Sequence, residues 1–476
     1  MTNHSQKSVD VVVVGAGMAG LSCADRLSRI GVDVLVCEAR DRVGGRTDSV
    51  EVDGVVVDLG GQFIGPGQDR VNALAAELGV AVRPTYTTGV HLAEDARGRV
   101  RRFRGTVPRL SFPALVDFAQ AEARFERLVR TVDVDAPWRS PHAQSLDSQT
   151  LAVWIHRVLR TAGGRRLFTT AAQLLWACEP SEISLLHALF YARAAGGLRA
   201  VMATEGGAQQ DMLDDGAHAL ALRLAERLDD RVRLKMPVRC VAQNEDGVRV
   251  TAESGETLQA ARVVVAIPPT LAGRLVYHPP LPAARDGLTQ RLAMGSTIKC
   301  MIVYPEPFWR GAGLSGHALS LRGPLAAVAD SSPASGRRGV LVSVLEGAAA
   351  RRLAGRTADE RRSLVLDELA RLFGPRAAHP AGYLERDWSA EPFTRGAYAA
   401  LFPAGAWTQY GLALRTPVGR IHWAGSEMAS RWYGYIEGAI RSGEAVAVAV
   451  AAALGVKRTD PSTTFSDSRP SKRPHR

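Results

Sequence analysis

The chain has 476 residues, with 59 Lys or Arg against 48 Asp or Glu, so its formal net charge is +11. A hydrophobic fraction of 46% with 22% charged residues excludes a mostly disordered chain, and the length predicts two or three domains. Only five of the basic residues are lysine, and the arginines are dispersed without a contiguous basic block in the body. Dispersed charge favours a compositional bias over an acidic partner, so we expect no nucleic-acid binding.

Cysteine and hydropathy patterns exclude further classes. Five scattered cysteines form no Cys-x-x-Cys pair, so we expect no zinc or other metal site and no disulfide framework. The N-terminus is polar and lacks the apolar core of a signal peptide. The longest apolar run near the other end, residues 445–456, has about 12 residues, whereas a membrane-spanning helix needs about 20. The sequence therefore predicts a soluble cytoplasmic protein without a membrane partner, with a homodimer as one option for its assembly.

A strand, a glycine-rich turn and a helix open the chain. Residues 9–14 form a β-branched run that is typical of a parallel strand buried on both faces. The turn at 15–20 reads Gly-Ala-Gly-Met-Ala-Gly, and a helical pattern follows as far as Arg29. Gly31 ends that helix, and a second strand is expected over residues 32–37. These elements predict a βαβ unit.

Two kinds of pattern alternate along the rest of the chain. Residues 86–209 are mainly helical in pattern, and strands are expected at 231–234, 248–250, 262–267 and 420–423, with a last helix from about Tyr435. The simplest fold class is α/β, with a Rossmann-like (doubly wound) domain interleaved with a second, mixed α+β domain. We assign residues 1–79, 211–285 and 391–456 to the first domain, 80–210 and 286–390 to the second, and 457–476 to a disordered tail.

The opening βαβ unit predicts a dinucleotide site. Gly15 permits the tight turn, Gly17 lets the backbone approach a pyrophosphate, and Gly20 lets the helix pack close to the strand. The free N–H groups at the start of the helix attract phosphate. Glu38 ends the second strand, where a carboxylate can hold two ribose hydroxyls.

The next segment indicates which dinucleotide is bound. Residues 40–46 read Arg-Asp-Arg-Val-Gly-Gly-Arg. Arg46 can make a forked contact to a buried pyrophosphate, while Gly44 and Gly45 let the backbone close in. Because an NAD enzyme needs no such segment, the pattern favours FAD.

With these motifs the sequence resembles the flavin-containing amine oxidase family, in its monoamine oxidase branch, over about residues 9–456. The motifs are GAGMAGL at 15–21, EARDRVGGR at 38–46, DLGGQFIGPGQDR at 58–70, AIPPTL at 266–271, GSTIKCMIVYPEPFWR at 295–310, LFPAGAWTQYG at 401–411 and WAGSEMASRWYGYIEGAIRSGE at 423–444. The resemblance implies that FAD is bound by Gly15, Gly17, Met18, Ala19, Gly20, Glu38, Ala39, Arg40, Gly44, Gly45, Arg46, Gly60, Gly61, Gln62, Phe63, Val238, Trp388, Gly425, Ser426, Glu427, Tyr435 and Ile436.

The expected catalytic residues are a lysine and two tyrosines. Lys299 lies in an otherwise apolar strand, and the residues alone leave open whether it faces solvent or is buried for pairing or chemistry. The resemblance favours burial, because Lys299 matches the family lysine that holds a water against the flavin N5 atom. Tyr398 and Tyr435 match the two aromatic residues that flank the amine. The two tyrosines are also expected to line the substrate pocket, together with Leu174, Leu175, Trp176, Ala200 and Val201.

Three positions depart from the family pattern. Ala397 stands where vertebrate monoamine oxidases carry the cysteine that attaches the flavin, so we expect noncovalent FAD. Asp214 and Asp215 replace a usual Gly-Gly pair, which leaves the conformation of that loop open. Glu205 replaces a neutral residue, and it either receives a second ammonium group or belongs to a solvated loop.

The resemblance implies an FAD-dependent oxidase of a small-molecule amine. A hydride equivalent would pass from a primary amine to flavin N5, the imine would hydrolyse to an aldehyde, and O2 would reoxidise the flavin to give hydrogen peroxide. One alternative is a flavin oxidase or dehydrogenase of another C–N substrate, such as a polyamine, an amino acid or a biosynthetic intermediate. Another is a flavin-binding scaffold without activity. The sequence does not single out the amine or the electron acceptor.

Overall fold

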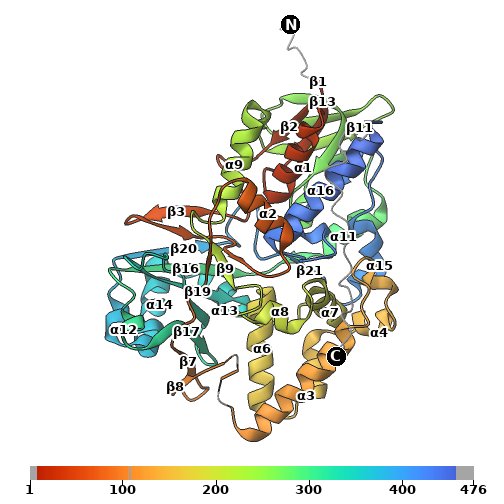
Figure 1. Cartoon of the computed structure of the whole chain (residues 1–476). Helices are drawn as coiled ribbons and strands as arrows, with labels where there is room; N and C mark the ends of the chain where they lie inside the picture. The colour runs from red at the N-terminus through yellow and green to blue at the C-terminus, as the bar shows by residue number, and fades with distance from the viewer. Residues whose placement is uncertain (1–7, 106, 109, 457–476) are drawn as a thin grey trace, which may run out of the picture.

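The first β-sheet surrounds the opening strand in the computed structural model, which describes residues 8–105, 107–108 and 110–456 (Figure 1). Its strands lie in the order β10-β2-β1-β13-β12-β11-β14, with β22 paired to β13. They are β1 (Ser8–Val14), β2 (Val34–Cys37), β10 (Val232–Arg233), β11 (Val238–Gln243), β12 (Val248–Ala252), β13 (Thr257–Val265), β14 (Val276–His278) and β22 (Ile421–Trp423). Strand β1 pairs in parallel with β2 and β13, which confirms the predicted βαβ unit.

Helices from both ends of the described chain pack together beside this sheet. Helix α1 (Met18–Arg29) packs against α16 (Ile436–Ala453) and α9 (His218–Leu228), as Figure 1 shows near the top of the molecule. The middle of β1 is fully buried, since Val11, Val12 and Val13 have no exposed surface. Burial on both faces explains the continuous β-branched run in the sequence.

A second sheet lies below the first in Figure 1 and has the strand order β20-β16-β19-β18-β17-β7-β8. Its strands are β7 (Val90–Glu94), β8 (Val100–Phe103), β16 (Thr297–Tyr304), β17 (Leu314–Ser320), β18 (Leu325–Asp330), β19 (Gly339–Glu346) and β20 (Gly382–Asp387). Helices α13 (Gly347–Ala354) and α14 (Ala358–Phe373) follow β19. The helical segment expected between residues 86 and 209 contains α3 (Phe112–Val129), α4 (Ala143–Asp147), α5 (Leu151–Val158), α6 (Ala162–Trp176), α7 (Leu185–Ala194) and α8 (Leu198–Met202), but it begins with strands β7 and β8.

The segment that carries Asp214 and Asp215 contains a strand that the sequence did not predict. Strand β9 (Asp211–Leu213) pairs with both β5 (Phe63–Ile64) and β6 (Val82–Pro84). It therefore ties the turn after Gly60-Gly61 to the segment that leads into β7. The tail predicted at 457–476 lies outside the described residues.

Candidate active site

One cavity of about 900 Å³ draws its lining from both sheets. Every residue predicted to bind the cofactor lines it, except Gly20 and Glu427. The absence of Gly20 from the wall fits its expected packing role, because a Cβ there would stand 2.0 Å from the Gly15 carbonyl oxygen. The residues predicted to bind the cofactor thus share the wall of one cavity.

The glycine-rich turns leave a cradle of suitable shape for a dinucleotide. Gly17 and Gly44 form a parallel β-bridge, and a Cβ on Gly45, whose φ is +60°, would lie 3.1 Å from the Gly17 Cα. Helix α1 starts beside the cavity without a side-chain cap, so its first N–H groups are available to a phosphate. Glu38 is fixed at the edge of the cradle, because its carboxylate accepts hydrogen bonds from the Ala16 N–H (2.8 Å) and the Arg40 N–H (2.9 Å). The residues present therefore fit FAD.

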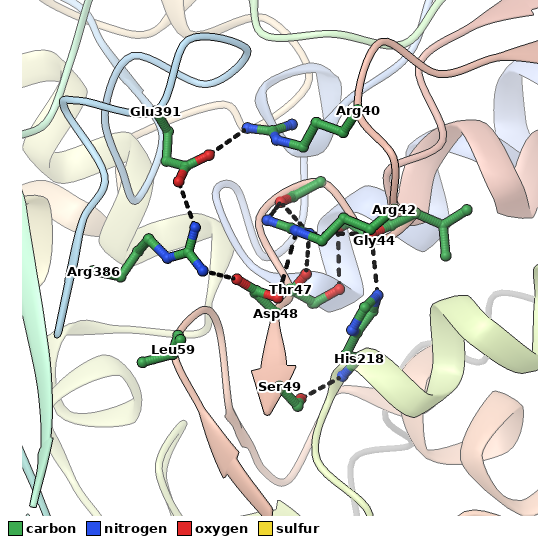
Figure 2. A network of polar contacts seen from close by, with 12 residues as sticks. Arg40, Arg42, Gly44, Thr47, Asp48, Ser49, Leu59, His218, Arg386 and Glu391 are labelled. Carbon is green, nitrogen blue, oxygen red and sulfur yellow. Dashed lines mark hydrogen bonds and ion pairs between the residues drawn. The ribbon is translucent and has the colours of Figure 1, made fainter. Parts of the chain in front are cut away.

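A polar network holds this cradle to the second sheet (Figure 2). Arg386 of β20 forms ion pairs with Asp48 (2.8 Å) and Glu391. Glu391 also pairs with Arg40 (3.4 Å), and Asp48 pairs with Arg42 (3.5 Å). All five side chains are buried or partly buried, so these contacts are screened little by solvent. The network fixes the cofactor loop relative to the strand that flanks β16.

Arg46 makes a forked contact to a carboxylate within the protein. Its guanidinium contacts both carboxylate oxygens of Glu427, at 2.6 and 2.9 Å, and donates to the Tyr398 carbonyl at 2.7 Å. Burial alone would raise the pKa of Glu427, but the charge and hydrogen bonds of Arg46 outweigh burial and lower it. The fork thus fixes the guanidinium of Arg46 on the cavity wall, where it also holds the Tyr398 carbonyl. The contact of Arg46 to a pyrophosphate stays a prediction.

Lys299 is buried at the centre of β16, with 8% of its surface exposed, so the solvent-facing alternative is wrong. Its Nζ donates hydrogen bonds to the Gly60 carbonyl (2.8 Å) and to Gln62 Oε1. Burial lowers the pKa of Lys299 to about 8, against the opposing charge of Asp58. A lysine with this pKa can exchange a proton near neutral pH.

One face of the second sheet forms the floor of the cavity. Lys299 stands opposite Val344 of β19, and Val344 stands opposite Ala327 of β18. Ala327 in turn stands opposite Leu319 of β17. Directly opposed residues in antiparallel strands point to the same face, and all four line the cavity. The floor therefore runs across the strands, away from Lys299.

The two predicted tyrosines lie on the cavity wall from different elements. Tyr398 follows Ala397, and Tyr435 stands at the N-terminal boundary of α16. The Tyr435 ring packs against Trp432, with centroids 5.1 Å apart, and against Tyr191, with centroids 5.8 Å apart. Burial raises the pKa of Tyr435 to about 12, and it also raises the pKa of Tyr398 well above its ordinary value. Both hydroxyls are therefore protonated at neutral pH.

Sequence reasoning missed a buried carboxyl behind Tyr398. Glu346 ends β19, and its Oε1 accepts hydrogen bonds from the Tyr398 and Thr297 hydroxyls. Its Oε2 is buried and has no hydrogen-bond partner. Burial raises the pKa of Glu346 well above its ordinary value, although the two hydroxyls oppose this shift. The available signal was a charged residue at the end of an apolar strand, in Val344-Leu345-Glu346.

Some of the predicted substrate residues line the cavity, and others lie behind its wall. Leu174, Leu175 and Val201 line the cavity, whereas Trp176 and Ala200 are absent from the lining that the described residues provide. Trp176 instead packs edge-on against a lining tyrosine, Tyr191, with centroids 5.6 Å apart. A helix turns its successive side chains to different faces, so neighbouring residues of one matched segment need not all reach the cavity. Tyr191, His91 and His317 line the cavity and were not predicted.

The two aspartates that replace a Gly-Gly pair are accommodated by arginines. Asp214 forms an ion pair with Arg83 (2.8 Å), and Asp215 forms one with Arg223 (2.7 Å). Only the following residue, Gly216, has a positive φ, of +76°. The loop therefore does not require glycine where the aspartates stand.

The described part of the chain offers neither a membrane span nor a metal centre. Among residues 8–456 apart from 106 and 109, no helix is long and apolar enough to cross a bilayer. The same residues contain no group of three or more His, Cys, Asp or Glu side chains that could hold a metal ion. All five cysteines are free.

Comparisons with known proteins agree with this geometry. The profile of a family described as flavin containing amine oxidoreductase matches residues 18–451. AofH of Mycobacterium tuberculosis, which is named as a flavin-containing monoamine oxidase, is 43% identical over 447 residues, or 94% of this chain and 97% of AofH. The L-amino acid dehydrogenase of Synechocystis is 39% identical over 455 residues, or 93% of this chain and 95% of that protein. Putrescine oxidase bound to putrescine superposes with a TM-score of 0.90 at 34% identity, covering 94% of this chain and 99% of that one.

Proposed function

This chain belongs to the family of flavin-containing amine oxidoreductases, and on that premise we propose that it oxidises a primary amine to an imine, with noncovalent FAD and with O2 as the electron acceptor. The observation that carries the proposal is the arrangement of Lys299, Tyr398 and Tyr435 in the same cavity as the dinucleotide cradle. Held in the cradle of Gly17, Gly44 and Glu38, FAD would supply the two-electron oxidation of the amine, with O2 as the final acceptor and hydrogen peroxide as the product.

The side chains of this chain orient the amine and keep it neutral. Tyr398 and Tyr435 present neutral phenol rings, whose faces attract a nitrogen group without adding charge. The apolar floor beside Lys299 disfavours the ammonium form, and only the neutral amine has a lone pair to assist loss of hydride. Lys299 can hold or release a proton at its Nζ, since its pKa is near the working pH.

The lining residues support noncovalent attachment of FAD. Ala397, which precedes Tyr398, has no thiol. Of the described residues that line the cavity, one is a cysteine, Cys37. It ends β2 next to Glu38, and burial raises the pKa of its thiol to about 12. Acid precipitation should therefore release all of the yellow cofactor into the supernatant. A flavin-bearing pellet would contradict this part of the proposal.

A panel of amines with a peroxide readout tests the reaction itself. Tyramine, phenethylamine, benzylamine, putrescine, spermidine and representative amino acids should be compared by kcat/KM at air saturation. Oxidation of at least one primary amine with one peroxide formed per amine supports the proposal. Flavin reduction without peroxide would show that another acceptor replaces O2.

An amino acid substrate is the second candidate, because a dehydrogenase of L-amino acids is 39% identical to this chain. Such a substrate needs a cation for its carboxylate. Among the described residues, four arginines line the cavity: Arg40, Arg46, Arg239 and Arg274. Arg40 and Arg46 belong to the predicted cofactor loop, where Glu427 engages Arg46, and Arg239 follows Val238, another predicted cofactor residue. Arg274 is therefore the arginine of these four that is left for a substrate carboxylate. Preferential oxidation of amino acids in the same panel would favour this candidate over a primary amine.

The domain division also remains a proposal. We propose one unit from residues 1–79, 211–285 and 391–456 and another from 80–210 and 286–390. The membership of the two sheets supports this division, because the first sheet draws on residues 8–37, 232–278 and 421–423 and the second on 90–103 and 297–387. A cytoplasmic location and a homodimer stay predictions from the sequence.

A further inference from the structure

The amine of Lys299 meets two acceptors at the wall of the cavity. Its Nζ donates to the Gly60 carbonyl (2.8 Å) and to Gln62 Oε1. All three residues line the cavity, and Gln62 is only 2% exposed. A lysine ammonium has three donors, whereas a neutral amine has two donors and a lone pair. With two hydrogens given to these acceptors, one position of Nζ remains, which is an N–H in the charged form and a lone pair in the neutral form.

The first acceptor, the Gly60 carbonyl, is held by the loop around it. The preceding Leu59 carbonyl accepts from Trp388 Nε1 (2.9 Å), which fixes the chain just before Gly60. A Cβ on Gly60 would lie 2.3 Å from the Arg46 carbonyl oxygen, so a larger residue does not fit there. Because this acceptor belongs to the backbone, the acceptor that a substitution can remove is the side chain of Gln62.

Two buried side chains decide which end of the Gln62 amide faces the lysine. Gln62 Nε2 donates to the hydroxyl of Ser331, which follows β18, and to the sulfur of Met212 on β9, each at 3.2 Å. Ser331 is 7% exposed and Met212 is 1% exposed. A hydroxyl and a thioether both accept from an amide N–H, whereas an ammonium group only donates. The amide oxygen therefore faces Nζ, and its direction is set from behind by β9 and by the residue after β18.

We propose that Gln62 is a positioning residue for Lys299, which takes up one hydrogen of Nζ and so turns the remaining, proton-exchanging position of the amine into the cavity. The role rests on the proposed amine oxidation, in which Lys299 holds or releases a proton, but the contact itself does not depend on turnover. Without Gln62 the amine keeps the single hydrogen bond to Gly60 and can rotate about it. The exchanging position then has no fixed direction.

The charged and titratable groups around Lys299 are unchanged when Gln62 is replaced. Strand β4 (Val55–Asp58) shares a buried cluster with β16, and β19 and β20 pair with β16 on either side. The groups on the face of Lys299 and their partners are Asp58 of β4, Glu346 with Tyr398, Arg386 with Asp48 and Glu391, and Arg83 with Asp214. Burial lowers the pKa of Lys299 to about 8, and the charge of Asp58 opposes this shift. A difference in that pKa between variants therefore reports the exchange at Gln62.

A titration of Lys299 in the holoenzyme tests the contact without turnover. The chain has only five lysines, so labelling with [6-13C]lysine gives at most five Cε signals in NMR spectra, and Lys299→Met identifies the signal of Lys299. This signal should titrate near pH 8 in wild type. Gln62→Met removes an acceptor that favours the charged amine, so the proton should bind about tenfold more weakly and the titration should move to lower pH. Gln62→Glu places a carboxylate against the amine and should move the titration to higher pH.

The pH profile of amine oxidation gives a second readout. The inflection that Lys299 imposes on the rate should follow the NMR titration, to lower pH in Gln62→Met and to higher pH in Gln62→Glu. A variant that only loosens the fold would lower the rate at every pH and leave the inflection in place. The matched control is Gln68→Met. Gln68 is fully buried in the same segment, and its amide atoms have no hydrogen-bond partner among the described residues, so this variant should titrate as wild type does.

The outcomes separate this inference from the proposed function. An unchanged Lys299 titration in Gln62→Met, a shift to lower pH in Gln62→Glu, or an equal shift in Gln68→Met would overturn the role of Gln62 while amine oxidation stands. Each Gln62 variant has its own expected direction, so one of them is sufficient if the other does not fold. A wild-type enzyme that oxidises no amine would overturn the proposed function, and the NMR titration would still decide whether Gln62 holds Lys299.

Discussion

Glu346 offers a direct test of how the reacting end of the cavity is held. Its Oε1 is the acceptor for the buried hydroxyls of Tyr398 and Thr297. Glu346→Leu leaves both hydroxyls without this acceptor, at a cost of about 1–3 kcal/mol of folding free energy for each. Glu346→Gln keeps a carbonyl oxygen in the same place and should cost less than about 1 kcal/mol.

The effect on catalysis should pass through the Tyr398 hydroxyl. If the lost anchor costs about 1–2 kcal/mol of transition-state positioning, kcat/KM for a monoamine falls about 5- to 30-fold in Glu346→Leu. Glu346→Gln should stay within about threefold of wild type, with equal flavin content measured by absorbance. In a Tyr398→Phe background, Glu346→Leu should cost less than about twofold, because the hydroxyl that it serves is gone. Equal losses in both backgrounds, or a glutamine variant as slow as the leucine variant, would refute the reasoning.

The stability of the same variants reports the protonation state of Glu346. Burial raises the pKa of its carboxyl well above the ordinary value, so the folded protein keeps a proton that the unfolded chain releases above about pH 4.3. Because the folded state binds more protons, this residue contributes less stability as the pH rises. The Tm of wild type should therefore fall relative to the Tm of Glu346→Gln as the pH rises above about 5. A Tm difference independent of pH would show that Glu346 is ionised in the folded protein.

Three further changes test the lysine, the attachment of flavin and the cradle. Lys299→Met should keep the flavin but slow its turnover about 10- to 100-fold. In stopped-flow experiments the wild-type rate should also change around pH 8, the pKa of Lys299, and the variant should lose that inflection. Ala397→Cys should leave part of the flavin in an acid-precipitated pellet, and a colourless pellet would argue against the predicted proximity. Arg386→Met breaks two ion pairs and should weaken FAD retention in dialysis about tenfold, whereas Arg376→Met, which breaks a surface pair, should not.

The sequence predicted those parts of the site whose residues lie close together along the chain. The turn at 15–20 and Glu38 lie within a single βαβ unit, so spacing alone defines their geometry. Lys299 stood out because a lone lysine in an apolar strand must be explained. The two tyrosines needed the family resemblance, since nothing around Tyr398 in the sequence shows that it meets Tyr435 in one cavity.

The parts that the sequence missed depend on pairing between distant strands. Glu346 reaches Thr297 only because β19 pairs with β16, and His317 meets His91 because β17 pairs in parallel with β7. Arg46 shows the same limit, because its contact with Glu427 joins residues 381 positions apart and was not predicted. Register across a sheet is set by the packing of the whole chain, and a single sequence does not reveal it.

Tyr398 connects the two halves of the molecule, and this explains why buried charges gather around it. Its carbonyl accepts from Arg46, which belongs to the cofactor cradle and is fixed by Glu427 near the start of α16. Its hydroxyl donates to Glu346 on the floor of the second sheet. A shift of either sheet would therefore break a buried hydrogen bond at this residue, which costs more than an exposed one. The position of the ring against the amine is thus tied to the position of the cofactor loop and of the floor of the cavity.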